Sequence, residues 1–178
     1  MNLPKNKDII FCFDTETTGI GPRDEACQLA IVNYSGVVVF DKILQPTIKI
    51  SEEAMAIHGI TDKMVREAYA ITYWGDYLCK NYFDYKIVLG YNVFYDLRII
   101  NQSLVARYDN SNNPRLPSPM MIIDVMKLYG DYTGISRFKS LKVACNECGI
   151  PVVETDLHGA SYDARLTMRL YRYLEDHS

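Results

Sequence analysis

The sequence lacks an excess of positive charge. Its 19 lysine and arginine residues are outnumbered by 22 aspartate and glutamate residues, which gives a net charge of −3. This balance argues against a protein that coats long duplex nucleic acid, because such binding depends on many cationic contacts with phosphates. It does not exclude an enzyme that holds a few nucleotides at one end, since bound divalent cations reverse the local sign of an acidic pocket.

A disulfide framework and long hydrophobic runs are also missing. The five cysteines are odd in number and irregularly spaced, and Cys145 and Cys148 form a C-x-x-C pair with no second pair nearby. We therefore predict packing for this pair, with no zinc or redox role. The N-terminal apolar run Ile9–Phe13 is far too short for a signal peptide or a membrane span. The expected location is a reducing cytoplasm, without membrane association.

The sequence does have the composition of a globular protein. Its 178 residues are 48% hydrophobic and 23% charged, which fits one domain over residues 1–178 with a sizeable core. Three strand-like segments come first, and short strands then alternate with helices, which predicts an α/β fold with a mixed five-stranded sheet flanked by helices. The predicted strands lie near 9–13, 27–33, 37–40, 87–89 and 121–123, the longer helices near 72–82, 92–107, 139–148 and 161–174, and a loop at 109–119.

Two carboxylates follow the first predicted strand. In Asp14-Thr15-Glu16 the acidic residues are two apart, so their side chains project from the same side of a strand. The ends of central strands are where α/β folds place ligands. A cation relieves the repulsion between two close carboxylates, and oxygen ligands suit magnesium or manganese. The alternative is a solvated strand end with two acidic caps.

Two further segments carry acidic residues. Asp96 lies in the helix predicted at 92–107, where it could instead be solvated or pair with Arg98 or Arg107. His158 precedes Asp163 by five residues, and Asp163 falls near the first turn of the last helix, so the two side chains can face one pocket. The alternative is an acidic helix N-terminus with a surface histidine.

These motifs, taken in order, resemble the DEDDh (DnaQ-like) family of 3′→5′ exonucleases, which contains the proofreading subunit of bacterial DNA polymerase III. The resemblance covers about Ile9 to Leu174, and the stretch from Ile50 to Val65 is especially similar to exonuclease X and its relatives. It implies a ribonuclease H-like fold. The segments that carry it are Asp14-x-Glu16 followed by Thr17-Thr18-Gly19, Ala56 to Thr61, Asn92-x3-Asp96, Ser140 to Ile150 and His158-x4-Asp163.

The resemblance implies two-metal hydrolysis at a 3′ end, with release of nucleoside 5′-monophosphates. Asp14, Glu16 and Asp163 would bind one Mg²⁺ ion, and Asp96 would help Asp14 hold a second, with Mn²⁺ able to substitute. His158 would be the general base.

The resemblance also implies contacts with the terminal nucleotide. We also expect several basic residues to contact phosphate groups of the substrate. The alternative is that these side chains simply form a solvated face. His58 could instead cap the next helix. Because the chain has 14 tyrosines, the presence of Tyr95 alone is only weakly informative. The implied substrate contacts are Thr17, Thr18, Gly19, Ile20, His58, Asn92 and Tyr95, and the basic candidates are Arg23, Arg66, Arg137, Lys139 and Lys142.

The expected partner is a nucleic acid 3′ end, in the first place single-stranded DNA. An exoribonuclease similar to RNase T or oligoribonuclease is the alternative, because no residue decides how a 2′-OH would be treated. A non-catalytic module that binds nucleic-acid ends is a second alternative. Association with a polymerase remains possible, although a chain ending at Ser178 favours a free-standing nuclease. The oligomeric state is left open.

Overall fold

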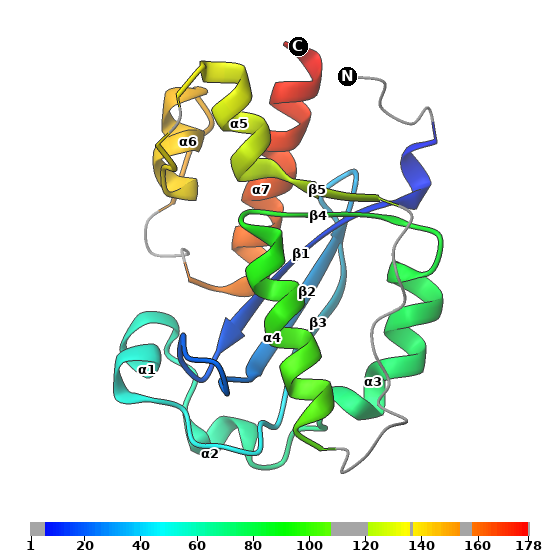
Figure 1. The fold of residues 1–178 in the computed structure, drawn as a ribbon, viewed down its shortest axis with the longest axis vertical. Coiled ribbons are helices and arrows are strands. Elements are labelled where there is room, and N and C mark those ends of the chain that lie inside the picture. Colours follow the sequence, from blue (N-terminus) through cyan, green and yellow to red (C-terminus); the bar gives the residue numbers. More distant parts are fainter. Residues whose placement is uncertain (1–5, 108–120, 136, 154–157, 178) are drawn as a thin grey trace.

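A five-stranded mixed sheet forms the centre of the molecule, in the strand order β3-β2-β1-β4-β5 (Figure 1). The structure is a computed structural model that describes residues 6–107, 121–135, 137–153 and 158–177, so the loop predicted at 109–119 lies outside the described residues. β1 is antiparallel to β2 and parallel to β4. The predicted sheet is thereby confirmed. Its strands are β1 (Ile10–Thr17), β2 (Ala26–Asn33), β3 (Val38–Ile43), β4 (Ile87–Gly90) and β5 (Met121–Asp124).

Helices cover both faces of this sheet (Figure 1). The prediction of one helix over 72–82 needs correction, because α3 stops at Leu78 and a π-helical segment, Cys79–Phe83, continues it. Ser51 and Asp124 cap the helices that follow them, as their side chains accept the N–H of Ala54 and Met126. The helices are α1 (Glu52–His58), α2 (Asp62–Val65), α3 (Ile71–Leu78), α4 (Val93–Val105), α5 (Val125–Thr133), α6 (Leu141–Glu147) and α7 (Ala160–Asp176), with a short 3-10 turn at Lys7–Ile9.

The central strand β1 separates two hydrophobic cores, because successive side chains of a strand point to opposite faces. Ile10 and Cys12 pack in a core that includes α5, α6 and α7. Phe11 and Phe13 pack in the other core, with α3 and α4. The same alternation continues past the cores to the end of β1. It directs Asp14 and Glu16 towards α7 and the intervening Thr15 towards α4.

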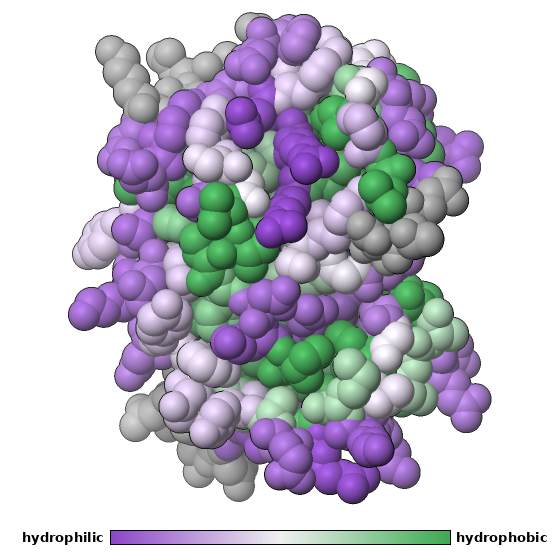
Figure 2. All heavy atoms as spheres, turned by 180° about the vertical axis from the view of Figure 1, so that it is seen from behind, coloured by the Kyte–Doolittle hydropathy of each residue, from purple (hydrophilic) through white to green (hydrophobic). Residues whose placement is uncertain are grey.

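The surface and the cysteines agree with the composition. Cys145 and Cys148 are free and buried, so the prediction of packing for this pair is confirmed. On the face opposite to that of Figure 1, hydrophobic patches alternate with hydrophilic side chains (Figure 2). Within the described ranges, we find no helix with both the length and the apolar character needed to cross a membrane.

Candidate active site

Three of the predicted metal ligands converge at the end of β1. Asp14 and Glu16 come from the strand and Asp163 from the first turn of α7, and one carboxylate oxygen from each lies within 4.8 Å of the other two. Glu16 is only 8% exposed. The Asp163 Oδ1 atom is buried and has no hydrogen-bond partner. The neighbouring charges that shift the pKa values of Asp14 and Glu16 are those of other carboxylates.

Asp96 approaches from the other side of the strand. It lies in α4, is 4% exposed, and its Oδ1 accepts hydrogen bonds from Thr15 N at 3.1 Å and Thr15 Oγ1 at 2.6 Å. It is not part of the group of three, although its charge contributes to raising the pKa of Asp14. Sequence reasoning missed Thr15, whose position between the two acidic residues was the available signal.

Burial raises the pKa of every carboxylate in this cluster, and repulsion between the clustered charges adds to this rise for Asp14 and Glu16. Burial is the largest cause for each, and it raises the pKa of Glu16 to about 8 and that of Asp96 to about 7. The pKa of Asp14 lies well above its usual value, since burial is reinforced by the charges of Asp96, Glu16 and Asp163. Burial also raises the pKa of Asp163. These all-oxygen donors, one of them without a partner, fit a divalent cation of the magnesium type.

His158 lies at the entrance to α7. It is exposed, its backbone is left-handed with φ of 64°, and its N–H donates to Asp163 Oδ2 at 3.2 Å. Burial is the main reason that the pKa of His58 is lowered, and the charge of His158 lowers it further. The two histidines therefore lie near the same cluster of carboxylates.

His58 contributes to a cavity of about 410 Å³ beside the carboxylates. Its Nδ1 accepts the N–H of Ile60 at 3.0 Å and its Nε2 donates to the Thr17 carbonyl at 3.1 Å, so it joins the end of α1 to the turn after β1. Ile20 is 87% exposed at the tip of that turn. The cavity is lined by Glu16, Thr17, Gly19, Ile20, Ser51, Glu53, Ala54, Ile57 and His58.

The turn after β1 is fastened by Asp24, which sequence reasoning did not identify. Asp24 Oδ1 accepts from Thr18 Oγ1 at 2.7 Å, and Asp24 Oδ2 accepts from the Gly21 N–H at 2.5 Å. A Cβ atom on Gly19 would lie 2.8 Å from Asp24 Oδ2, so the turn can close this tightly only with glycine at that position. The Tyr95 hydroxyl donates to the Gly19 carbonyl at 3.2 Å, so α4 supports the turn as well.

Asn92 directly precedes α4, and its side chain makes no capping hydrogen bond to that helix. It adopts a left-handed conformation with φ of 62°, which asparagine tolerates better than most residues, and its N–H donates to Asp124 Oδ1 at 3.0 Å. Of the basic candidates, Lys139 forms an ion pair with Glu147, which fits the solvated-face alternative. The side chains of Arg23, Arg66 and Arg137 are exposed.

Comparison with known proteins identifies the family. A family model described as exonuclease matches residues 11–171. The uncharacterized exonuclease CP81 of Escherichia phage 186 is 36% identical in an alignment 178 positions long. The alignment covers 90% of this chain and 84% of the relative. A DNA polymerase III subunit epsilon-like protein of Rhodobacter capsulatus is 30% identical over 94% of this chain, which spans 24% of that relative. RNA exonuclease 4 of Saccharomyces cerevisiae is 28% identical over 97% of this chain and 57% of its own length.

A solved structure has the same fold. Exonuclease X, in complex with 5′ overhanging duplex DNA, superposes with a TM-score of 0.70 at 22% identity, covering 95% of this chain and 92% of that one. The ribonuclease H-like fold class is thereby confirmed. Together with the family match, this shows that the chain belongs to the exonuclease family, as a DnaQ-like 3′→5′ exonuclease.

Proposed function

We propose that this chain removes nucleotides from the 3′ end of DNA by metal-dependent hydrolysis, as a single exonuclease domain over residues 1–178. The observation that supports this proposal most strongly is the convergence of Asp14, Glu16 and Asp163 at the end of β1, with one Asp163 oxygen buried and unpartnered. Like charges brought together without a cationic side chain are costly unless a cation is bound.

In the proposed mechanism, Asp14, Glu16, Asp163 and Asp96 hold two Mg²⁺ ions, for which Mn²⁺ can substitute. Such ions supply a water of lowered pKa and neutralise the charge that builds on the reacting phosphate. His158 takes the proton from the attacking water as the general base. Its exposed position beside Asp163 supports this role. The product is a nucleoside 5′-monophosphate.

The cavity beside the carboxylates is the proposed site of the terminal nucleotide. Ile20 and His58 line it, so an apolar side chain is available for the base and a polar one for the sugar. Asn92 and Tyr95 are proposed to contact the sugar and base from α4. Thr17 and Gly19 also line the cavity. The expected contact of Thr18 is not supported, because Thr18 is fully buried and its N–H and carbonyl bond to Glu25 and Ser51. Aromatic and apolar packing does not distinguish between bases, which suits an enzyme that removes any nucleotide.

DNA is the proposed substrate because exonuclease X, the structural relative with similar dimensions, is described with DNA. RNA is the second candidate, favoured by the likeness to RNA exonuclease 4. The epsilon-like relative makes association with a polymerase a further possibility to test by co-purification. A reducing cytoplasm is the proposed location, because all five cysteines are free thiols.

The test is an exonuclease assay with matched single-stranded DNA and RNA oligonucleotides labelled at the 5′ end. We expect a ladder that shortens from the 3′ end with Mg²⁺ or Mn²⁺, no shortening with EDTA, and faster hydrolysis of DNA. Faster hydrolysis of RNA would assign the chain to the exoribonuclease alternative. A folded protein that shortens neither strand with either metal would support the non-catalytic module.

A further inference from the structure

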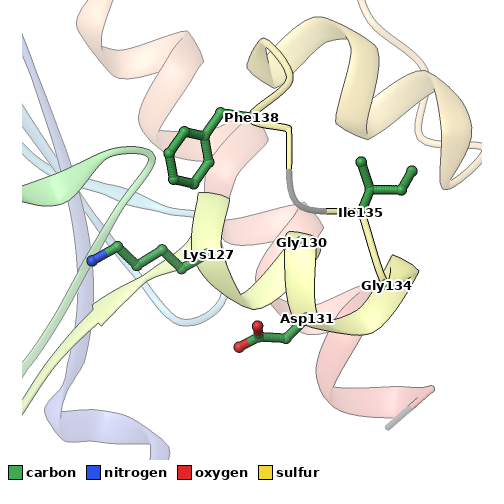
Figure 3. Close-up of a pocket in the computed structure, with 6 residues that line it drawn as sticks. All are labelled: Lys127, Gly130, Asp131, Gly134, Ile135 and Phe138. Atoms are coloured by element: carbon green, nitrogen blue, oxygen red, sulfur yellow. The ribbon is translucent and has the colours of Figure 1, made fainter.

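A second cavity, of about 540 Å³, lies beside α5, outside the group of carboxylates (Figure 3). Helix α5 ends at Thr133 and is capped by Gly134, whose φ is 67°, and the Ile135 N–H donates back to the Gly130 carbonyl at 3.1 Å. Ile135 and Phe138, which follow the helix in sequence, line the cavity together with residues of α5. Figure 3 shows the side chains of Lys127 and Phe138 extending on the same side of α5, with Asp131 farther along the helix.

Two contacts connect this cavity to the active site. The Lys127 Nζ atom lies 5.1 Å from the ring centroid of Phe94, which is two residues before Asp96 in the first turn of α4. The Tyr91 hydroxyl donates to the Lys139 carbonyl at 2.6 Å and so fixes the residue after Phe138 next to the start of α4. In Figure 1 the first turns of α4 and α7 lie between α5 and α1, the helix that lines the first cavity.

The side chains around this cavity have the chemistry of a single-strand binding surface. Phe94 is 52% exposed and Phe138 is 63% exposed, although the transfer of apolar rings out of water is favourable. Exposed aromatic rings stack on nucleobases whatever their sequence, and a cation between them binds the phosphate that joins two bases. Isolated hydrophobic residues are common on protein surfaces. Here, however, Phe94 belongs to α4, the helix that carries Asp96, and its ring lies beside Lys127 of the cavity. Because the carboxylate of Asp131 repels phosphate, we expect the phosphate groups of a bound strand to lie on the Lys127 side of the cavity.

We propose that Phe94, Lys127 and Phe138 bind substrate nucleotides upstream of the one being removed, with bases on the rings and a phosphate at Lys127. This inference rests on the proposed function, because it concerns the strand whose 3′ end occupies the active site. The first cavity then holds the terminal nucleotide and this surface holds the strand behind it. The nucleotides assigned to this surface are those beyond the one next to the scissile bond, so the surface acts only on substrates longer than a dinucleotide.

The test compares a dinucleotide with a labelled 12-nucleotide single strand. Binding of the longer strand is measured by fluorescence anisotropy with Ca²⁺ in place of Mg²⁺, so that it can be read without turnover. We expect Phe138→Ala to weaken this binding by about 5- to 100-fold, the usual range for loss of one stacked base. Lys127→Ala should lower the slope of log Kd against log salt by about one. Both variants should hydrolyse the dinucleotide with wild-type KM and kcat.

Matched controls separate this surface from general charge and packing effects. Lys63→Ala removes one exposed positive charge from α2 and should leave the affinity and its salt slope unchanged. Phe138→Leu keeps apolar volume without a stacking ring and should behave like Phe138→Ala. The inference is overturned if Phe138→Ala and Lys127→Ala bind the 12-nucleotide strand like the wild type, or if they impair the dinucleotide equally. A wild-type protein that binds the strand but hydrolyses no substrate would contradict the proposed function. The comparison of the variants' affinities with that of the wild type would still test the binding surface.

Discussion

Thr15 holds Asp96 in place with two hydrogen bonds, from its N–H at 3.1 Å and its Oγ1 at 2.6 Å to the same carboxylate oxygen. Thr15 lies between Asp14 and Glu16 and faces α4, whereas the acidic pair faces α7. The strand therefore presents two carboxylates on one side and, through Thr15, fixes a third on the other. Both hydrogen bonds favour the charged form of Asp96 and so oppose the rise in its pKa that burial causes.

Thr15→Val tests this positioning role. Valine keeps the shape of the side chain but removes the hydroxyl, so Asp96 loses one hydrogen bond and its pKa rises further. We expect a fall of about 10- to 100-fold in Mg²⁺ affinity or in kcat/KM, the range usual for residues that orient a metal ligand. Isothermal titration with Mg²⁺ and kinetics over a pH range measure both effects. Thr15→Ser keeps the hydroxyl and should restore both values, and a Thr15→Val enzyme with a wild-type pH profile would contradict the role.

Asp14→Asn should abolish turnover and at the same time stabilise the metal-free protein. The substitution removes a carboxyl whose ionisation is disfavoured in the folded state by burial and by the charges of Asp96, Glu16 and Asp163, so the free energy of unfolding in EDTA should rise. A gain of about 1 kcal/mol raises the Tm by about 2–4 °C for a chain of this size. Differential scanning calorimetry with EDTA and with Mg²⁺ checks both points, since Mg²⁺ should stabilise the wild type more than the variant. Retained exonuclease activity would contradict the assignment of Asp14 as a metal ligand.

His158→Ala should slow hydrolysis by ~100- to 10,000-fold, the usual contribution of a general base. Mg²⁺ affinity should change little, because the carboxylates remain. Single-turnover hydrolysis of a 5′-labelled oligonucleotide gives the rate, and titration calorimetry gives the affinity. His177→Ala removes a histidine at the far end of α7 and is the matched control. A His158→Ala rate equal to that of the wild type would remove this residue from the mechanism.

The acidic residues of the site were largely predictable from sequence, but the residues that hold them and the neighbouring turn in place were not. The two-residue spacing of Asp14 and Glu16 predicts that they share a face, and the structure brings Asp163 to that same face from α7. Thr15 was not predicted as a partner of Asp96, because a hydrogen bond between residues 81 positions apart leaves no local pattern. Asp24 accepts from Thr18 and Gly21, six and three positions away, but an acidic residue in a turn does not by itself identify such partners. The π-helical end of α3 was missed because its residues also fit a regular helix.

Asp24→Asn should loosen the turn that follows β1. Asparagine can still accept from Thr18 Oγ1, but its amide nitrogen would face the Gly21 N–H in place of an acceptor oxygen. We expect KM for DNA to rise while kcat changes much less, because the proposed function assigns the terminal nucleotide to this turn, which carries no metal ligand. Steady-state kinetics with a single-stranded oligonucleotide separate the two parameters. Asp41→Asn, on the edge strand β3, is the control, and a fall in kcat alone would contradict a role in substrate positioning.

The raised pKa of Glu16 makes the metal-free protein less stable as the pH increases. In the folded protein this carboxyl has a pKa of about 8, against 4.5 for an ordinary glutamate, so the folded state binds more protons between these values. Its stabilising contribution is therefore complete below pH 4.5 and is lost as the pH rises through 8. Unfolding in EDTA should show a free energy that declines over this interval, and Glu16→Gln should reduce the decline. Mg²⁺ should reverse the trend, since it binds the deprotonated carboxylates and releases their protons. A Glu16→Gln variant with an unchanged pH dependence would show that other groups cause it.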